Sequence, residues 1–459
     1  MLPIPITAVT SDTEFKTLKP LTLRRRFGHG VIWNTAAVAF NQGSTFAANL
    51  LLANVLGRAG FGAYAIVLST SQAVAQLASL GMGSTATRYL AEYRAANRDR
   101  AEAILGFTFS VAISSAVVAG VAVGIGGGWV AAHVLMAPQL GQLLRVAGIA
   151  VLFSVMNGYL MGALAGLERF QSLGRTNAFA GLLYVGLAAV GAYEWGIAGA
   201  VWGLAISGAA QCLLLYVAFR RAIEAAALVA RRSEIGQDAA IITRWVVPGV
   251  LGGFTSTAAL WGLQALLTRR PDGLSAVAIY GAAYNLMTVV LFLPNVANSV
   301  GMTLLNNLLG ARDAGQYRRF FWHNMKATLA VVVVGAAFLG IMGHVLLRMY
   351  GRAFEPGFIP LLVLLAATIP ESLTIALSQV VLAQERIWTS IISVNAPRDL
   401  LIVIMALILI PVYGVLGAAL AYLGGRLIGL AATGLLVAHL GLRLPPARVP
   451  LIRTEPGLQ

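Results

Sequence analysis

The chain has 459 residues, of which 58% are hydrophobic and only 11% are charged, and its formal net charge is +15. Soluble domains carry roughly 25% charged residues, so the composition excludes an ordinary water-soluble globule and indicates a polytopic membrane protein. The basic excess does not indicate nucleic-acid binding, because the Lys and Arg residues lie in short clusters between apolar runs and form no single basic face.

Apolar runs separated by Gly, Pro and charged residues predict about twelve transmembrane helices, at roughly 20 residues for each span. Helices are expected because lipid offers the backbone no hydrogen-bond partners. The expected spans are 30–56, 60–83, 102–125, 142–165, 173–193, 197–219, 242–267, 276–308, 325–348, 358–383, 389–410 and 414–440. We therefore expect an all-α membrane protein with an N-terminal tail (1–29), an N-lobe (30–219), a linker (220–241), a C-lobe (242–440) and a C-terminal tail (441–459).

Arginines recur in every second loop between these spans, within 88–100, 169–175, 220–232 and 312–319. The alternate loops carry few positive charges. By the positive-inside rule, the arginine-rich loops and both termini are cytoplasmic. The segment 1–29 lacks the apolar core of a signal peptide, so we expect it to form a cytoplasmic tail.

The sequence repeats itself across its two halves. Glu168 in the first half recurs as Glu385 in the second, each followed by an arginine, and Gly196 recurs as Gly414 at almost the same offset. Six spans in each half would make the repeat parallel, related by an axis along the membrane normal. Two similar apolar halves are typical of a secondary transporter whose site lies between them.

Catalytic and cofactor motifs are missing from the sequence. There is no phosphate-binding lysine loop, no nucleophile elbow and no zinc-binding histidine pair. Cys212 is the sole cysteine and the five histidines are scattered, so we expect no metal site and no cofactor. A membrane-embedded glycan polymerase or ligase should present charged residues on a large outer loop, which this sequence lacks, so we expect no enzyme activity.

Polar residues inside the spans are candidates for lining a cavity. Asn34, Asn41 and Asn49 recur about every two helical turns, so they fall on one helical stripe beside Gln42. The second and eighth spans add Gln72, Gln76, Asn285, Asn295 and Asn298. These side chains either line a wet cavity between the halves or hydrogen-bond neighbouring helices as packing contacts.

Charged residues inside the spans are fewer. Glu371 follows Pro370 within the tenth span and is either hydrogen-bonded to a neighbouring helix or titrates in ion coupling. Arg398 and Asp399 are further ion-coupling candidates; as sequence neighbours on a helix they point about 100° apart, so we expect each to pair with another helix. Arg145 and Arg426 could meet a phosphate or neutralise an acidic residue, and we favour structural pairing.

Basic and acidic residues also close several spans. Arg58 ends the first span and Arg270 ends the seventh, where they either snorkel to the interface or attract an anionic head group. The pairs Glu168-Arg169 and Glu385-Arg386 close the fourth and tenth spans. We expect them to form inter-helix salt bridges at an inner gate, which must break and reform during alternating access.

Three stretches carry a family resemblance. They are Leu56-Gly57-Arg58-Ala59-Gly60-Phe61-Gly62-Ala63-Tyr64, Leu80-Gly81-Met82-Gly83-Ser84-Thr85-Ala86-Thr87-Arg88-Tyr89, and Tyr350-Gly351-Arg352-Ala353-Phe354 with Pro360-Leu361. They resemble the polysaccharide transporter family within the multidrug/oligosaccharidyl-lipid/polysaccharide exporter superfamily. The basic loop with an Asp-Arg core that marks major-facilitator transporters is missing after the second span.

The resemblance implies two six-helix lobes around a central cavity. It also implies a flippase, as in O-antigen export, that moves an undecaprenyl-pyrophosphate-linked oligosaccharide across the bacterial cytoplasmic (inner) membrane for surface polysaccharide and lipopolysaccharide synthesis. The expected partners are this substrate, membrane lipids and a coupling cation, H⁺ or Na⁺, with no nucleic acid and with the protein as a monomer. A cation-coupled multidrug exporter of the same superfamily is the alternative.

Overall fold

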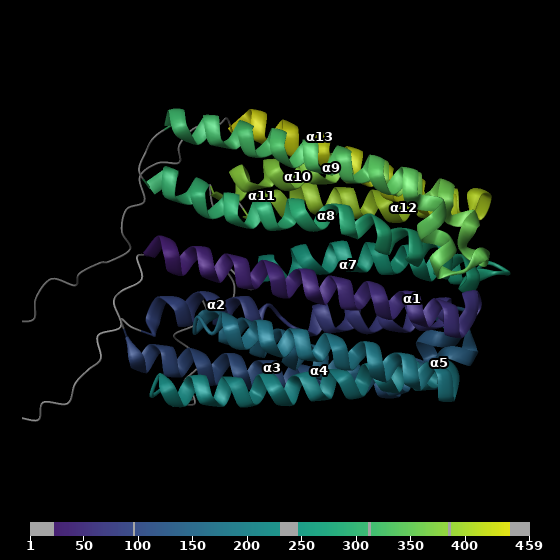
Figure 1. Ribbon diagram of the computed structural model, residues 1–459, viewed down its shortest axis with the longest axis horizontal. Coiled ribbons are helices and arrows are strands. Elements are labelled where there is room, and N and C mark those ends of the chain that lie inside the picture. The colour runs from purple at the N-terminus through teal and green to yellow at the C-terminus, as the bar shows by residue number, and fades with distance from the viewer. Residues whose placement is uncertain (1–22, 95–96, 230–246, 311–313, 384–386, 441–459) are drawn as a thin grey trace, which may run out of the picture.

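The computed structural model describes residues 23–94, 97–229, 247–310, 314–383 and 387–440. In these ranges every regular element is a helix, and nine helices are long and apolar enough to cross a membrane. The helices lie side by side along the long axis of the molecule (Figure 1). This confirms an all-α, multi-pass membrane protein, while the count of twelve spans stays a prediction.

The helices divide into two lobes. The N-lobe holds α1 (Leu23–Ala78), α2 (Met82–Tyr93), α3 (Arg98–Trp129), α4 (Gly141–Gly166) and α5 (Phe170–Ala225). The C-lobe holds α7 (Val247–Thr268), α8 (Gly273–Gly310), α9 (Ala314–Tyr350), α10 (Phe358–Ala383), α11 (Ile387–Ser390), α12 (Ala396–Tyr413) and α13 (Val415–Leu440). Short 3₁₀ and π turns connect them at Val130–Val134, Pro138–Leu140, Arg352–Gly357 and Ile391–Asn395. Helix α5 continues to Ala225, past the sixth span's predicted end at 219, and most of the predicted linker lies outside the described residues.

The two ends of the bundle differ. We call the end where α1 begins at Leu23 the terminal end, and the opposite end, which holds Gly57 and Thr268, the far end. Helix α7 also runs towards the far end, because its last residue, Thr268, donates a hydrogen bond to the Leu135 carbonyl of the turn after α3. Both lobes therefore start in the same direction, as a parallel repeat requires.

Single glycines reverse the chain at the far end. Helix α1 folds back at Gly57 (φ 68°, ψ −179°) and α5 at Gly196 (φ 60°, ψ −140°). Gly414 (φ 59°, ψ −125°) makes the same kind of reversal between α12 and α13. These positive φ values favour glycine, which has no Cβ to clash with the backbone. Each of α1 and α5 is therefore a pair of antiparallel arms.

The repeated glycines Gly196 and Gly414 thus mark equivalent hairpins. Just after each turn, a Cβ on Gly199 would collide with the Gly191 carbonyl, and a Cβ on Gly417 with the Leu409 carbonyl. Small residues here let the two backbones touch. The repeat seen in the sequence is therefore a repeat of local structure.

Large aromatic side chains surround the far-end turns. Tyr193 and Trp195 lie just before the α5 reversal at Gly196 and are 79% and 73% exposed, and Trp129 at the end of α3 is 62% exposed. Tyrosine and tryptophan concentrate at membrane–water interfaces, where an apolar ring and a polar tip are both accommodated. Their position indicates that the turns lie at the interface level.

The lobes meet mainly along α1, which packs against α7 and α8 (Figure 1). At the far end, Asn54 Nδ2 donates to the Met349 carbonyl at 2.7 Å and Arg58 Nη1 donates to the Ala353 carbonyl at 3.3 Å. Phe61 contacts the Phe354 ring edge-on, at 6.0 Å between centroids. This end is closed by both polar and aromatic contacts.

Three further hydrogen bonds join the lobes. Thr268 Oγ1 donates to the Leu135 carbonyl at 2.8 Å, and Arg269 Nε donates to the Val134 carbonyl at 3.1 Å. Deeper in the bundle, Trp261 Nε1 donates to Thr70 Oγ1 at 2.9 Å. The interlobe hydrogen bonds recorded between described residues thus gather at the far end and in the middle of the bundle.

Candidate functional site

A buried ion pair lies inside the C-lobe. Helix α10 supplies Glu371 and α13 supplies Arg426, with Arg426 Nη2 3.1 Å from Glu371 Oε1. The two side chains are only 13% and 12% exposed. Ionisable groups inside a membrane protein are costly unless they are paired, and they commonly mark ion or substrate pathways. Of the two alternatives for Arg426, the structure therefore selects pairing with an acidic residue.

Tyr422 completes this pair as a triangle. Its hydroxyl donates to Glu371 Oε2 at 2.7 Å and accepts from Arg426 Nη2 at 2.9 Å. The Arg426 guanidinium also lies 4.7 Å from the centre of the Tyr422 ring, within cation–π range. Each member of the triangle contacts the other two, so moving one of them disturbs both remaining contacts.

Helix geometry explains how these groups meet. Tyr422 and Arg426 are one turn apart, so they share a face of α13. Sequence reasoning missed Tyr422, although this spacing from an in-span arginine could have identified it. Tyr284 of α8 meets the Tyr422 ring edge-on at 5.9 Å, and Tyr280 stacks on Tyr284 at 5.9 Å. The ion pair is thus walled by aromatic rings from a third helix.

One polar atom of this cluster is unused. Arg426 Nε is buried and finds no hydrogen-bond partner within the described part of the chain. A buried donor without a partner costs free energy comparable to that of a lost hydrogen bond. Arg426 therefore has an unused N–H donor beside its salt bridge with Glu371. An unused donor is suited to a side chain that exchanges one partner for another.

Arg398 and Asp399 differ in part from the sequence expectation. They pair with each other, Nε to Oδ1 at 2.8 Å, and both also bond Ser256 of α7. Each residue thus bonds another helix through Ser256, as expected, but the ion pair that they form with each other was not expected. Gly429 of α13 leaves space for the Arg398 side chain, since a Cβ there would lie 2.8 Å from Arg398 Cδ.

The predicted polar stripe is only partly described. The side chains of Asn34 and Asn41 lie outside the described residues, Asn49 is buried, and Gln42 is exposed. Gln72, Gln76 and Asn295 are exposed, and Asn285 is half-buried. The structure brings Gln76 to the other lobe, because a Cβ on Gly253 of α7 would lie 2.8 Å from its Nε2. A cavity-lining role for these residues stays a prediction.

Asn298 of α8 joins a buried polar network instead of standing alone. Gln379 Nε2 of α10 donates to Asn298 Oδ1 at 2.8 Å, and Asn324 Nδ2 of α9 donates to the same atom at 3.1 Å. Three helices of the C-lobe are thus tied together. This is the packing role that was the second alternative for in-span amides.

The basic residues predicted for a rim lie at the far end. Arg58 bridges the lobes as described, while Arg270 Nη1 donates to the carbonyls of Ile410 and Pro411 at 2.5 and 2.8 Å. Arg270 thereby caps the end of α12, where the Ile410 carbonyl also accepts a bond from the Gly414 N–H. Arg145 is exposed on α4, with its Nη2 3.2 Å from a Cβ placed on Gly128.

The first predicted gate pair lies at the terminal end. Glu168, in a left-handed conformation (φ 57°), ends α4, and its Oε1 lies 2.6 Å from Arg94 Nη2 after α2. This is an inter-helix salt bridge, but both partners belong to the N-lobe. Arg169 is exposed, and Glu385 and Arg386 lie outside the described residues. A gating role for these pairs stays a prediction.

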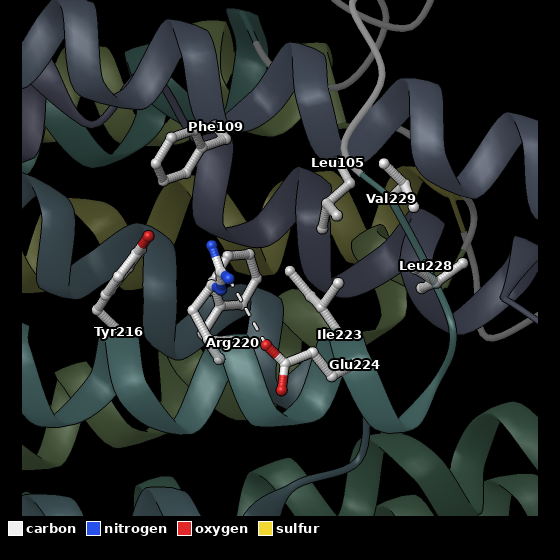
Figure 2. A pocket seen from close by; sticks show the side chains of 9 residues that line it. Leu105, Phe109, Tyr216, Arg220, Ile223, Glu224, Leu228 and Val229 are labelled. Carbon is white, nitrogen blue, oxygen red and sulfur yellow. Dashed lines mark ion pairs between the residues drawn. The ribbon is translucent and has the colours of Figure 1, made fainter.

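Two surface grooves flank the second arm of α5. One, of about 310 Å³, lies between α3 and α5 and is mostly apolar, with Phe109, Phe219 and Ile223 in its wall. Figure 2 shows Arg220 and Glu224 forming an ion pair in it, at 3.6 Å. The other groove, of about 470 Å³, lies between the two arms of α5 and is polar and basic.

The chain is similar to known transporters. Residues 27–305 match the model of the family described as "Polysaccharide biosynthesis protein". A multidrug resistance MATE family transporter of the MOP superfamily, solved in an inward-facing conformation, superposes with a TM-score of 0.72 at 13% identity, over 89% of this chain and 98% of the other. A MOP superfamily transporter from Pyrococcus furiosus, for which a reversed polarity of the binding pocket suggests a different function, gives 0.66 at 14% identity, over 91% and 95%.

An outward-facing MATE family transporter of the same superfamily gives a TM-score of 0.62 at 16% identity, covering 91% of this chain and 95% of the other. No match was found among curated protein sequences. At these identities the solved structures establish the fold alone, which is the two-lobed MATE-type bundle. The family match covers more than half of the residues, so the chain belongs to the family described as "Polysaccharide biosynthesis protein", and it is a multi-pass membrane protein with the MATE-type fold.

Proposed function

We propose that the protein is a flippase that moves a lipid-linked oligosaccharide across the bacterial cytoplasmic membrane by alternating access. The observation that carries the proposal is the family match over residues 27–305. A lipid-linked glycan has a diphosphate and sugars that cannot enter hydrocarbon unaided. A polar path between two lobes would shield these groups while the prenyl tail stays in lipid.

The distribution of interlobe contacts supports alternating access. The lobes are joined at the far end through Asn54, Arg58 and Thr268, and in the middle through Trp261. If the arginine-rich loops are cytoplasmic, the far end is the outer side. The structure then corresponds to the state closed towards the outside, and transport requires these contacts to break while others form at the terminal end.

The C-lobe triangle is the proposed coupling device. A cation bound to the Glu371 carboxylate would neutralise its charge and release Arg426, whose Nε already lacks a partner among the described residues. The freed guanidinium could then contact an anion such as the diphosphate. H⁺ and Na⁺ are the two candidates for this cation.

A gene-replacement experiment tests the proposal. Deleting the gene should abolish surface polysaccharide and cause undecaprenyl-pyrophosphate-linked oligosaccharide to accumulate, as measured by mass spectrometry of extracted lipids. The wild-type gene should restore both. A Glu371→Gln variant should restore less than a tenth of the surface polysaccharide, because the proposed cation site is gone. A Glu355→Gln variant at the far end should behave like the wild type and serves as the control for expression.

Two outcomes would contradict the proposal. Unchanged surface polysaccharide in the deletion strain, with new sensitivity to cationic dyes, would identify a multidrug exporter instead. Full function of a Glu371→Gln, Arg426→Ala double variant would refute the coupling role alone and leave the flippase intact. The coupling ion follows from proteoliposomes in which a proton or a sodium gradient is imposed separately.

A further inference from the structure

Apart from Arg169, the basic groove between the two arms of α5 is made of residues that have been given no role so far. It opens at the terminal end and has a volume of about 470 Å³, within the range of small-molecule sites. Every residue that lines it belongs to α5 or is Arg169, the residue just before α5. The groove is therefore a property of one hairpin within the N-lobe.

The shape of the groove follows from the sequence of the hairpin. Near the reversal, the arms touch through Gly191 and Gly199. Further along, Gln211 Nε2 donates to Asn177 Oδ1 at 3.1 Å and still bridges the arms. Beyond this bridge the facing residues are larger, and the arms separate around Leu214. The groove therefore lies beyond the Gln211–Asn177 hydrogen bond, between the ends of the two arms.

Three arginines gather at the open side of the groove. Arg169 and Arg175 come from the first arm and Arg221 from the second, with Ser172 and Thr176 between them. None of the three makes an ion pair with a described carboxylate. The nearest acidic neighbours in sequence are already engaged: Glu168 pairs with Arg94, and Glu224 pairs with Arg220.

The remaining wall of the groove is apolar. Leu214, Val217 and Ala218 line it on the second arm, and Val217 is 40% exposed. A groove with unpaired guanidinium groups and hydroxyl donors at its mouth and an aliphatic wall behind them matches a phosphate joined to an acyl chain. Arginine recognises phosphate by bidentate hydrogen bonds, and basic residues at this depth attract anionic lipid head groups.

We propose that this groove binds an anionic phospholipid as a resident lipid, with its phosphate held between Arg175 and Arg221. The occupant is a resident lipid and not the transported one, because one hairpin supplies the whole groove. Rocking of the lobes would leave the groove unchanged, whereas a site for cargo must change between states. The bound lipid would fix the spread ends of the two arms at the membrane surface.

Native mass spectrometry of the full-length protein in detergent tests this proposal, with phosphatidylglycerol as the probe and phosphatidylethanolamine as the zwitterionic comparison. We expect the wild type to bind phosphatidylglycerol preferentially. An Arg175→Gln, Arg221→Gln variant should bind it at least tenfold more weakly. Arg220→Gln is the matched control, because this adjacent exposed arginine is ion-paired in the other groove, and its affinity should stay within twofold of the wild type.

Three further measurements can support or refute the proposal. An Arg175→Lys, Arg221→Lys variant should keep most of the binding, and its retention guards against misfolding of the Gln variant. Equal binding of the two phospholipids by the wild type would refute the proposal whatever the variants do. Displacement of phosphatidylglycerol by undecaprenyl diphosphate at an equal concentration would also refute it, by making the groove a cargo site. The flippase proposal, tested by surface polysaccharide, would survive either result.

Discussion

The two lobes use the same scaffold around different interiors. Asp399 corresponds to Gly181 by the same offset that relates Gly414 to Gly196, and each faces a serine on the first helix of its own lobe, Ser256 of α7 and Ser44 of α1. In the C-lobe, Ser256 Oγ donates to Asp399 at 2.9 Å. In the N-lobe, a Cβ on Gly181 would lie 2.9 Å from Ser44 Oγ. At the same point of contact, one lobe has a polar network that includes Arg398 and the other has close packing.

The second charged site of the C-lobe shows the same difference. By the offsets of the repeat, Arg426 corresponds to Gly208 and Glu371 corresponds to Ser154. In the N-lobe, Gly208 packs near Phe153, where a Cβ would lie 3.6 Å from the Phe153 Cβ. Because the N-lobe forms its hairpins without buried ion pairs at these places, the C-lobe charges are not required by the architecture. The two lobes therefore differ in buried charge at equivalent positions.

Removing one partner of the C-lobe ion pair should have the largest effect. Glu371→Gln or Arg426→Met leaves an uncompensated buried group and should destabilise the protein by about 3–5 kcal/mol. The double variant should recover much of this loss, because no unpaired charge remains. Thermal unfolding in detergent measures the difference. Additive single effects would mean that the two residues do not act as a pair.

Equivalent glycine substitutions in the Gly196 and Gly414 hairpins should destabilise the two lobes equally. Gly199→Ala and Gly417→Ala each place a methyl group against a backbone carbonyl and should each cost about 3 kcal/mol by overpacking. Gly186→Ala is the control, since a Cβ there meets nothing within 4 Å. It should be neutral or slightly stabilising, because alanine favours helix. A large difference in unfolding temperature between Gly199→Ala and Gly417→Ala would argue against equivalent hairpins.

Variants at the Ser44–Gly181 contact test whether close packing in the N-lobe takes the place of the polar network in the C-lobe. Gly181→Ala should destabilise the N-lobe by about 1–2 kcal/mol, because its Cβ would lie 2.9 Å from Ser44 Oγ. Adding Ser44→Gly removes the obstructing atoms and should restore part of the stability. Denaturation curves for the two variants measure the rescue. If Ser44→Gly gives none, close packing is not what distinguishes this lobe.

Loss of an interlobe hydrogen bond should have the smallest effect. Asn54→Ala removes the bond to the Met349 carbonyl, which is worth about 1 kcal/mol, and should shift the balance between open and closed states by about fivefold. Distance measurements between spin labels at Trp195 and Tyr413, in a Cys212→Ser background, would detect wider far-end separations. An unchanged distance distribution would mean that Asn54 does not hold the lobes closed.

Much of the architecture could be predicted from the sequence, because lipid permits few structures and charge sets loop positions. The matched spacing of Gly196 and Gly414 indicated a repeat, and the structure shows that both glycines reverse the chain. Pairing of side chains was harder to predict. Glu371 and Arg426 belong to different spans, and only the packing of α10 on α13 selects this pairing among the alternatives.

Arg398 and Asp399 show where such predictions are incomplete. Both bond Ser256 of another helix, as expected, but their own ion pair was missed because a long arginine side chain can span the angle between neighbouring positions on a helix. Tyr422 was missed because its role depends on a hydroxyl group that reaches Glu371 on another helix. Side-chain length and the local space left by Gly429 decide such contacts, and neither can be read from spacing alone.

The tight glycine turns also limit how much protein surface is accessible from the compartment beyond the far end. Gly196 and Gly414 reverse the chain within a single residue, and Tyr193 and Trp195 hold the first of these turns at the membrane surface. These turns expose little backbone to which antibodies, proteases or soluble partners on that side could bind. Recognition by such partners would therefore have to depend on the longer far-end segments, such as Val130–Val134 and Arg352–Gly357.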